Sequence, residues 1–191
     1  MEQQVFKKIG VELEGLADIM FDRFIDHSSE KRPIEQKLYL NEKGELVIPA
    51  ENIYAFLFSE NPPGCAKAFE GKKGKEYFRL GQGSVFVSPF HIPALHNSLP
   101  VVVDKVIGDQ FWVFEAAPRT KSGSLSIKQE IKPRPVLKLP WNITFEITII
   151  ESVLITETKI LNWFTKGGIE IGLGTYRPRF GRFHVKRFEA S

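Results

Sequence analysis

The stretch GGIEIGLGTYRPRFGRFHV, residues 167–185, decides how the last third of this chain folds. Its glycines come first, and arginines and aromatic residues then alternate. The preceding segment ETKILNWFT, residues 157–165, has apolar residues at helical spacing, and Gly167 and Gly168 are expected to end that helix. Residues 180–188 alternate as a strand. The chain is therefore expected to close with a helix, a glycine-rich connection and a strand.

The residues before this stretch predict a mixture of strands and helices. Residues 17–24 fit either a short helix or an irregular strand, and Pro49 is well placed to begin a helix. A second helical piece at 65–77 is weakened by Gly71 and Gly74. The expected strands lie at 5–14, 84–87, 101–107, 110–115 and 142–150, and a hairpin spans 37–48 with its turn at 41–44.

This order of elements favours an α+β fold of the ferredoxin-like (RRM-like) type. In such a fold an antiparallel sheet carries helices on one face, and its other face is free to bind a partner. The 191 residues, 42% of them hydrophobic, suffice for one core with a large insertion. We expect a single domain over 1–191, in which 81–140 form an inserted β and loop arm. Within it, residues 119–141 are basic and rich in proline and serine, which is typical of an exposed loop.

Composition indicates a soluble, cytoplasmic protein. The chain has no run of 18 apolar residues and no signal-peptide core, so no membrane partner is expected. The one cysteine, Cys65, excludes an internal disulfide and fits a reducing compartment. The formal net charge is only +3, but residues 172–187 hold five basic residues and no acid, and 118–140 hold six against one acid. This asymmetry favours a side that faces a polyanion.

No metal or cofactor site is predicted. The four histidines form no HxxxH or HExxH pair, and His91 and His96 flank a proline at a spacing that suits no single helix face. Cys65 has no partner histidine near it in the sequence, so we expect an inert side chain. The GKKGK run, residues 71–75, lacks a following serine or threonine and is not a phosphate-binding loop, although it adds basic charge.

The glycine-rich ending resembles that of the RAMP superfamily, the RRM-like proteins that bind CRISPR guide RNA. In that superfamily a glycine-rich loop lies between the second helix and the last strand of a ferredoxin-like unit. The backbone-subunit branch is the most similar, together with phage-encoded proteins of similar build. Those phage proteins share segments like LADIMFDRF (residues 16–24) and GELVIPAENIYAFL (44–57). The residues that carry the likeness in the ending are Gly172, Gly174, Tyr176, Phe180 and Gly181.

The resemblance implies single-stranded nucleic-acid binding without catalysis, in a homo-oligomer or a multi-subunit assembly. The residue types suit that role, because glycines let backbone amides approach phosphates, arginines attract them and aromatic rings stack on bases. Alternation in the last strand assigns about half of Phe180, Phe183 and Phe188 to the core. The expected contacts are Gly172, Gly174, Tyr176, Arg177, Arg179, Phe180, Gly181 and Arg182, with Lys128, Lys132 and Arg134 from the basic arm.

Two alternatives remain open. Some RAMP relatives cleave RNA with a histidine or an aspartate soon after the first strand. In an endoribonuclease of that kind, His27 or Asp26 would serve here. The spacing of Asp18, Asp22 and Asp26 equally fits one solvated helix face, and no second histidine or lysine supports acid–base cleavage. In the other alternative, a structural subunit uses its arginines to meet acidic protein surfaces. The sequence does not distinguish an RNA ligand from DNA.

Overall fold

Two antiparallel sheets build the fold in residues 6–23, 33–103, 108–116 and 132–191, the part of the chain that the computed structural model describes. The main sheet has the strand order β10-β1-β9-β5-β3, with β4 paired to β9 and β6 paired to β5. The second sheet has the order β2-β8-β7. The strands are β1 (Phe6–Gly15), β2 (Ile19–Met20), β3 (Val47–Pro49), β4 (Val85–Ser88), β5 (His91–His96), β6 (Leu99–Pro100), β7 (Phe111–Ala116), β8 (Lys132–Leu137), β9 (Trp141–Ile150) and β10 (Phe183–Ala190).

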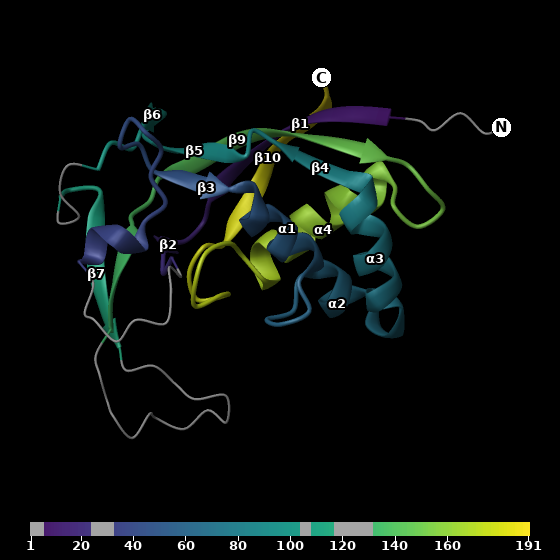
Figure 1. Cartoon of the computed structure of the whole chain (residues 1–191), viewed down its shortest axis with the longest axis horizontal. Helices are drawn as coiled ribbons and strands as arrows, with labels where there is room; N and C mark the ends of the chain where they lie inside the picture. Colours follow the sequence, from purple (N-terminus) through teal and green to yellow (C-terminus); the bar gives the residue numbers. More distant parts are fainter. Residues whose placement is uncertain (1–5, 24–32, 104–107, 117–131) are drawn as a thin grey trace.

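The α-helices gather against one face of the main sheet (Figure 1). Phe56 of the first helix shows how the layers meet, because its ring centroid lies 5.5 Å from that of Phe164 on the last helix and 5.3 Å from that of Phe183 on β10. The helices are α1 (Ala50–Phe58), α2 (Cys65–Phe69), α3 (Gly74–Ser84) and α4 (Glu157–Glu170), and the 3-10 helices are η1 (Ile34–Lys37) and η2 (Gly71–Lys73).

The period-two pattern of the long strands explains this layering. In β1 the side chains of Ile9, Val11 and Leu13 are fully buried, whereas Glu12 and Glu14 between and after them point to the opposite face. Burying each such apolar side chain contributes about 1.5–3 kcal/mol to folding. Because β9 alternates in the same way beside β1, the two strands at the centre of the sheet present one continuous apolar face to the helices.

The predicted α+β fold, an antiparallel sheet with helices on one face, is confirmed. Several local predictions also hold. The alternating residues 142–150 lie in β9, and Pro49 is the N-cap residue of α1. In the predicted turn, the side-chain oxygen of Asn41 accepts hydrogen bonds from the backbone N–H groups of Lys43 and Glu45 at 2.9 and 3.0 Å.

The predicted end of the last helix is wrong, because α4 continues through Gly167 and Gly168 to Glu170. Both glycines are buried at the contact between α4 and its neighbours. A Cβ atom on Gly167 would lie only 2.5 Å from Sγ of Cys65, and one on Gly168 would lie 2.5 Å from the carbonyl oxygen of Phe183. These glycines therefore allow close helix packing rather than ending the helix.

The strand predicted at 101–107 is not found in the described part of that range. At 101–103 the structure has no strand, and Val102 forms only an isolated bridge with Glu45, while 104–107 lie outside the described residues. The sequence analysis instead missed β5, which contains Pro93. Pairing of β5 with β9 begins only at Ala94, so the missing N–H of Pro93 leaves no gap in that ladder.

The second sheet corrects the expectation of an exposed loop at 119–141. Its last part forms β8, in the middle of the second sheet, where Val136 and Leu137 are fully buried. The backbone N–H of Phe21 donates to the carbonyl oxygen of Pro135 at 3.0 Å. Residues 117–131 lie outside the described part of the chain. In Figure 1, β7 stands at the end of the molecule opposite α3.

Candidate nucleic-acid interface

The predicted binding run forms a folded loop between α4 and β10, residues 171–182, here called the glycine loop. It closes on itself through a hydrogen bond from the backbone N–H of Leu173 to the carbonyl oxygen of Gly181, 2.9 Å. Two backbone hydrogen bonds also join the loop to the segment around β2. The N–H of Gly181 donates to the backbone carbonyl oxygen of Asp18 at 2.8 Å, and the N–H of Thr175 donates to that of Met20 at 2.9 Å. The glycine loop is therefore a structured element.

The glycines make this folding possible. Gly172, Gly174 and Gly181 all have positive φ, at 76°, 76° and 73°. A Cβ atom on Gly174 would lie 2.5 Å from the oxygen of Met20, and one on Gly181 would overlap the carbonyl of Leu173. The N–H groups of Gly172 and Gly181 donate to protein carbonyl oxygens. In this conformation those two amides shape the loop and are not directed at a ligand.

Aromatic rings hold the glycine loop against the second sheet. The ring of Phe180 is only 6% exposed and lies 6.0 Å from that of Trp112 and 5.5 Å from that of Phe114. The half-buried ring of Tyr176 lies 5.7 Å from that of Phe114. We call these four residues, Trp112, Phe114, Tyr176 and Phe180, the aromatic cluster. Phe180 is buried, whereas Tyr176 is only partly buried.

Trp112 and Phe114 are the residues of this region that the sequence analysis missed. Their segment was correctly predicted as a strand, but no position in it was assigned to the candidate site. The available signal was the aromatic run FWVF at 111–114, next to a basic stretch. Pairing of β7 with β8 aligns Phe114 with Arg134, which brings the rings beside the predicted basic residues.

Two arginines of the glycine loop point outward. Arg179 is exposed, and its guanidinium carbon lies 5.6 Å from the ring centroid of Phe114 and 5.8 Å from that of Phe180. Arg182 is also exposed, and its Nε donates to the carbonyl oxygen of Pro178 at 2.9 Å. Neither guanidinium has a carboxylate within 4.0 Å among the described residues. Both cations are therefore available to an anion.

Arg177 is placed differently from these two arginines. Its side chain is half-buried, and Nη1 donates a long hydrogen bond of 3.4 Å to the carbonyl oxygen of Gly172. Burial lowers the pKa of its guanidinium, although the proximity of Cys65 raises it. The cis peptide bond between Arg177 and Pro178 turns the chain at this point. Arg177 consequently contacts the inside of the glycine loop.

The predicted basic residues of β8 also differ in how exposed they are. Lys132 is exposed, but Arg134 is only 5% exposed and its Nε donates to the carboxylate of Asp22 at 2.7 Å. Lys37 approaches the same carboxylate at 3.7 Å, and burial lowers the pKa of its ammonium although Asp22 raises it. The guanidinium carbon of Arg134 lies 5.1 Å from the ring centroid of Tyr176. Arg134 thus joins β8 to the glycine loop. Lys128 lies outside the described residues.

Two of the three aspartates spaced four residues apart, Asp18 and Asp22, make structural contacts. The carboxylate of Asp18 accepts hydrogen bonds from Nε1 of Trp112 at 2.9 Å and from the N–H of Leu139 at 3.0 Å. Asp18 and Asp22 flank strand β2, so the expected shared helix face is wrong. Asp26 and His27 lie outside the described residues, and the structure leaves their role open.

The helix-free face of the main sheet carries charges that neutralise one another. Lys186 approaches Glu12 at 3.1 Å and Lys8 approaches Glu146 at 3.6 Å. Since these carboxylates come from the two central strands, the face offers a polyanion no uniform positive field. The exposed arginines of the glycine loop form the stronger candidate.

No group of three or more His, Cys, Asp or Glu side chains among the described residues is arranged to hold a metal ion. Across the same residues, no helix combines the length and the hydropathy needed to cross a bilayer.

The fold is similar to that of one chain in a solved structure. No protein-family profile and no curated protein matches the chain in sequence. Among solved structures, it is similar to a chain in the cryo-EM structure of the Type III-B Cmr-beta bound to cognate target RNA. The two chains are 15% identical with a TM-score of 0.58, and the match covers 97% of this chain and 60% of the other. The likeness concerns the fold, and it agrees with the α+β arrangement described above.

Proposed function

We propose that this chain binds single-stranded RNA without cleaving it, as a RAMP-like domain within a multi-subunit assembly. The contact surface is the outer side of the glycine loop and the adjoining end of β8. Arg179, Arg182 and Lys132 attract the phosphates, and the accessible part of Tyr176 offers a ring to an unpaired base. Gly172, Gly174 and Gly181 set the shape of the loop.

The observation that carries this proposal is the exposure of Arg179 and Arg182 on a loop that is held in place. Several cations elsewhere on the described surface, Lys7, Lys159 and Lys186 among them, lie within 4.0 Å of carboxylates, although those around the start of α3 do not. The two loop arginines have no such partner among the described residues. Because the aromatic cluster and the backbone hydrogen bonds already order the glycine loop, binding requires little further ordering of the chain.

The comparison supports RNA as the ligand and an assembly as the setting. The similar chain belongs to a structure with target RNA bound, and the likeness extends over 97% of the present chain. Single-stranded DNA shares the phosphate chemistry, so it serves as the competing ligand in the test. The contacts described are directed at phosphates and stacked bases, and binding should therefore depend little on base sequence.

Fluorescence anisotropy with labelled single-stranded RNA, single-stranded DNA and duplex RNA tests the proposal. We expect the tightest binding to single-stranded RNA, and a linear fall of log K with log salt over about 0.05–0.5 M. A denaturing gel of the same mixtures, with and without Mg²⁺ or Mn²⁺, should show intact RNA. Absence of salt-sensitive binding to every single strand would refute RNA binding. Specific cutting would instead favour the endoribonuclease alternative.

A further inference from the structure

A second basic surface surrounds the start of α3. Figure 1 places α3 at the end of the molecule opposite β7. Five exposed cations form this surface, here called the α3 basic surface: Lys67, Lys72, Lys73, Lys75 and Arg79. Lys67 joins it from α2, because a Cβ atom on Gly74 would lie 3.1 Å from the Cα atom of Lys67. Four of these cations line an open hollow of about 690 Å³, together with Glu76 and Leu80.

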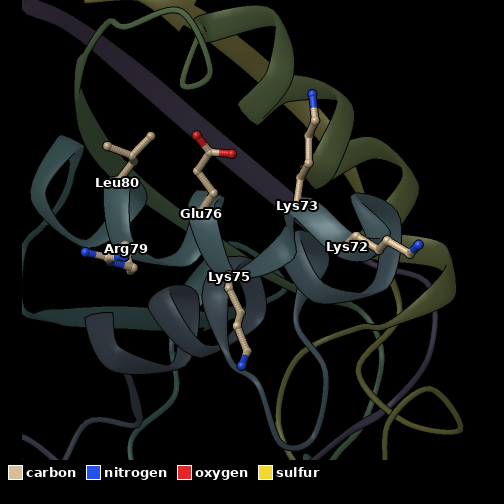
Figure 2. Close-up of a pocket in the computed structure, with 6 residues that line it drawn as sticks. All are labelled: Lys72, Lys73, Lys75, Glu76, Arg79 and Leu80. Atoms are coloured by element: carbon tan, nitrogen blue, oxygen red, sulfur yellow. The ribbon is translucent and has the colours of Figure 1, made fainter.

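The cations of the α3 basic surface lack acidic partners. None of the five has a carboxylate within 4.0 Å in the part of the chain that the structure describes. Glu76 is the one acid that lines the hollow, and Figure 2 shows its carboxylate directed away from Lys75. On the neighbouring α4, by contrast, Lys159 lies 3.0 Å from Glu70 and Lys166 lies 4.0 Å from Glu170. The excess of positive charge is therefore local to α3.

The position of these lysines opposes the stability of the helix. Lys72 and Lys73 immediately precede α3, and Lys75 lies in its first turn. The N-terminal end of a helix carries partial positive charge, so cations there are unfavourable. Lys75 and Arg79 add a like-charge pair four residues apart. Such a local conflict with helix stability is expected where residues serve binding rather than folding.

The arrangement fits an extended polyanion better than a small anion or a protein. In Figure 2 the side chains of Lys72, Lys73, Lys75 and Arg79 fan outward and do not converge on one point. Protein interfaces depend on buried aromatic or aliphatic anchors, but the lining of the hollow includes a single apolar side chain, Leu80, which is 39% exposed. A chain of phosphates meets spread cations without such anchors.

We infer that the α3 basic surface is a second contact site for the phosphate backbone of single-stranded RNA. It is separate from the glycine loop and holds the part of a long strand that extends beyond the loop. The inference rests on the proposed function, because it assumes RNA as the ligand. Lysines dominate the surface, and they act on phosphates as point charges rather than as readers of base edges. Contact there should be independent of base sequence.

The test compares oligonucleotides of two lengths. The short probe, of about 8 nucleotides, has the size that a single site covers, and the long probe has about 40. The test variant carries Lys72→Gln, Lys73→Gln, Lys75→Gln and Arg79→Gln. A control variant with the same charge change carries Lys8→Gln, Lys43→Gln, Lys166→Gln and Lys186→Gln, all at exposed positions elsewhere.

We expect the test variant to bind the short probe as the wild type does. For the long probe its affinity should fall at least about tenfold more than that of the control variant. Its salt slope should also decrease by about 2–3, since each lost phosphate contact on a single strand removes about 0.7. Its melting temperature should not fall, because the replaced cations oppose the helix dipole.

The outcomes separate this inference from the proposed function. If the wild type binds neither probe, the proposed function fails and the inference fails with it. If the wild type binds both probes but the test variant matches the control variant on the long one, the inference alone is overturned. It is also overturned if the test variant loses both probes equally, or if it keeps RNA binding and loses binding to polyglutamate, which would indicate an acidic protein partner.

Discussion

The guanidinium carbon of Arg134 lies 5.1 Å from the ring centroid of Tyr176 while its Nε donates to the carboxylate of Asp22 at 2.7 Å. This one side chain therefore links β8, the segment after β2 and the glycine loop. Arg134 is 5% exposed and its charge depends on Asp22 for compensation. The arginine that the sequence suggested as a phosphate contact is thus committed to holding the candidate surface together.

Replacing Asp22 should destabilise the protein. Asp22→Asn keeps the size of the side chain but leaves the buried guanidinium of Arg134 without its anion, so we expect a loss of about 2–3 kcal/mol in the free energy of unfolding. Urea denaturation measures this loss. Glu115→Gln, at an exposed position on β7, is the matched control and should change stability by less than about 0.5 kcal/mol. Equal stability of the two variants would show that the contact of Arg134 with Asp22 is not structural.

The glycine loop should tolerate no side chain at Gly181. Gly181→Ala combines a positive φ of 73° with an overlap between the new Cβ atom and the carbonyl of Leu173. We expect the free energy of unfolding to fall by about 3 kcal/mol or more. Gly44→Ala is the matched control, because Gly44 has a φ of 74° with no atom within 4 Å of the added Cβ. Gly44→Ala should lose only the free energy of holding a residue with a Cβ atom at positive φ, about 1–2 kcal/mol. Similar losses in both variants would contradict the close packing of the loop.

The two helical glycines Gly167 and Gly83 should respond in opposite directions. Alanine favours a helix by about 1 kcal/mol over glycine, but at Gly167 the new Cβ atom would meet Sγ of Cys65 at 2.5 Å. Overpacking there should make Gly167→Ala destabilising by about 1–3 kcal/mol. Gly83 in α3 has open space, so Gly83→Ala should be neutral or stabilising by up to about 1 kcal/mol. Thermal unfolding followed by circular dichroism compares the two, and stabilisation by both alanines would argue against the tight contact between α4 and α2.

Part of the acid sensitivity of the fold should come from Glu70. Burial alone would raise the pKa of its carboxyl, but hydrogen bonds from Nε1 of Trp163 at 2.9 Å and from Nζ of Lys159 at 3.0 Å outweigh burial and hold it below its ordinary value of 4.5. A carboxyl with a lowered pKa stabilises the folded state fully above pH 4.5, and that contribution is lost as the pH falls through the lower folded-state value.

A double-mutant cycle on Glu70→Gln and Lys159→Gln measures this contribution. We expect a coupling free energy of about 0.5–1 kcal/mol at about pH 7, because both side chains are partly exposed. The coupling should decrease as the pH falls through the lowered folded-state pKa of Glu70, since the carboxylate loses its charge there. A coupling that persists unchanged in acid would mean that the ion pair is not its source.

The regular elements were predictable because their side chains alternate or repeat with the period of the backbone. β9 and the start of α1 after Pro49 follow from local pattern alone. The end of α4 could not be predicted in this way. A glycine pair near the end of a helix can either terminate the helix or allow a close contact with a neighbouring element. Only the distances to Cys65 and Phe183 distinguish them.

The sequence predicted where the glycine loop lies but not how each of its residues packs. Residues 172–182 do form a distinct loop with exposed arginines. Sequence could not show that Phe180 and Arg134 are buried, because their partners, Trp112 and Asp22, are tens of residues away along the chain. Burial of an aromatic or charged side chain in a loop or in a small sheet depends on such distant contacts, and local composition carries no record of them.

The affinity of the double variant Arg179→Gln with Arg182→Gln for single-stranded RNA tests the central claim most directly. Both residues are exposed, so the fold should be retained, and a variant with Lys8→Gln and Lys166→Gln supplies an equal change of charge elsewhere. In about 0.1 M salt we predict at least a tenfold weaker Kd than for this control, and a salt slope smaller by about 1.4. A Kd and a salt slope equal to those of the control, in a variant with an unchanged melting temperature, would contradict the account.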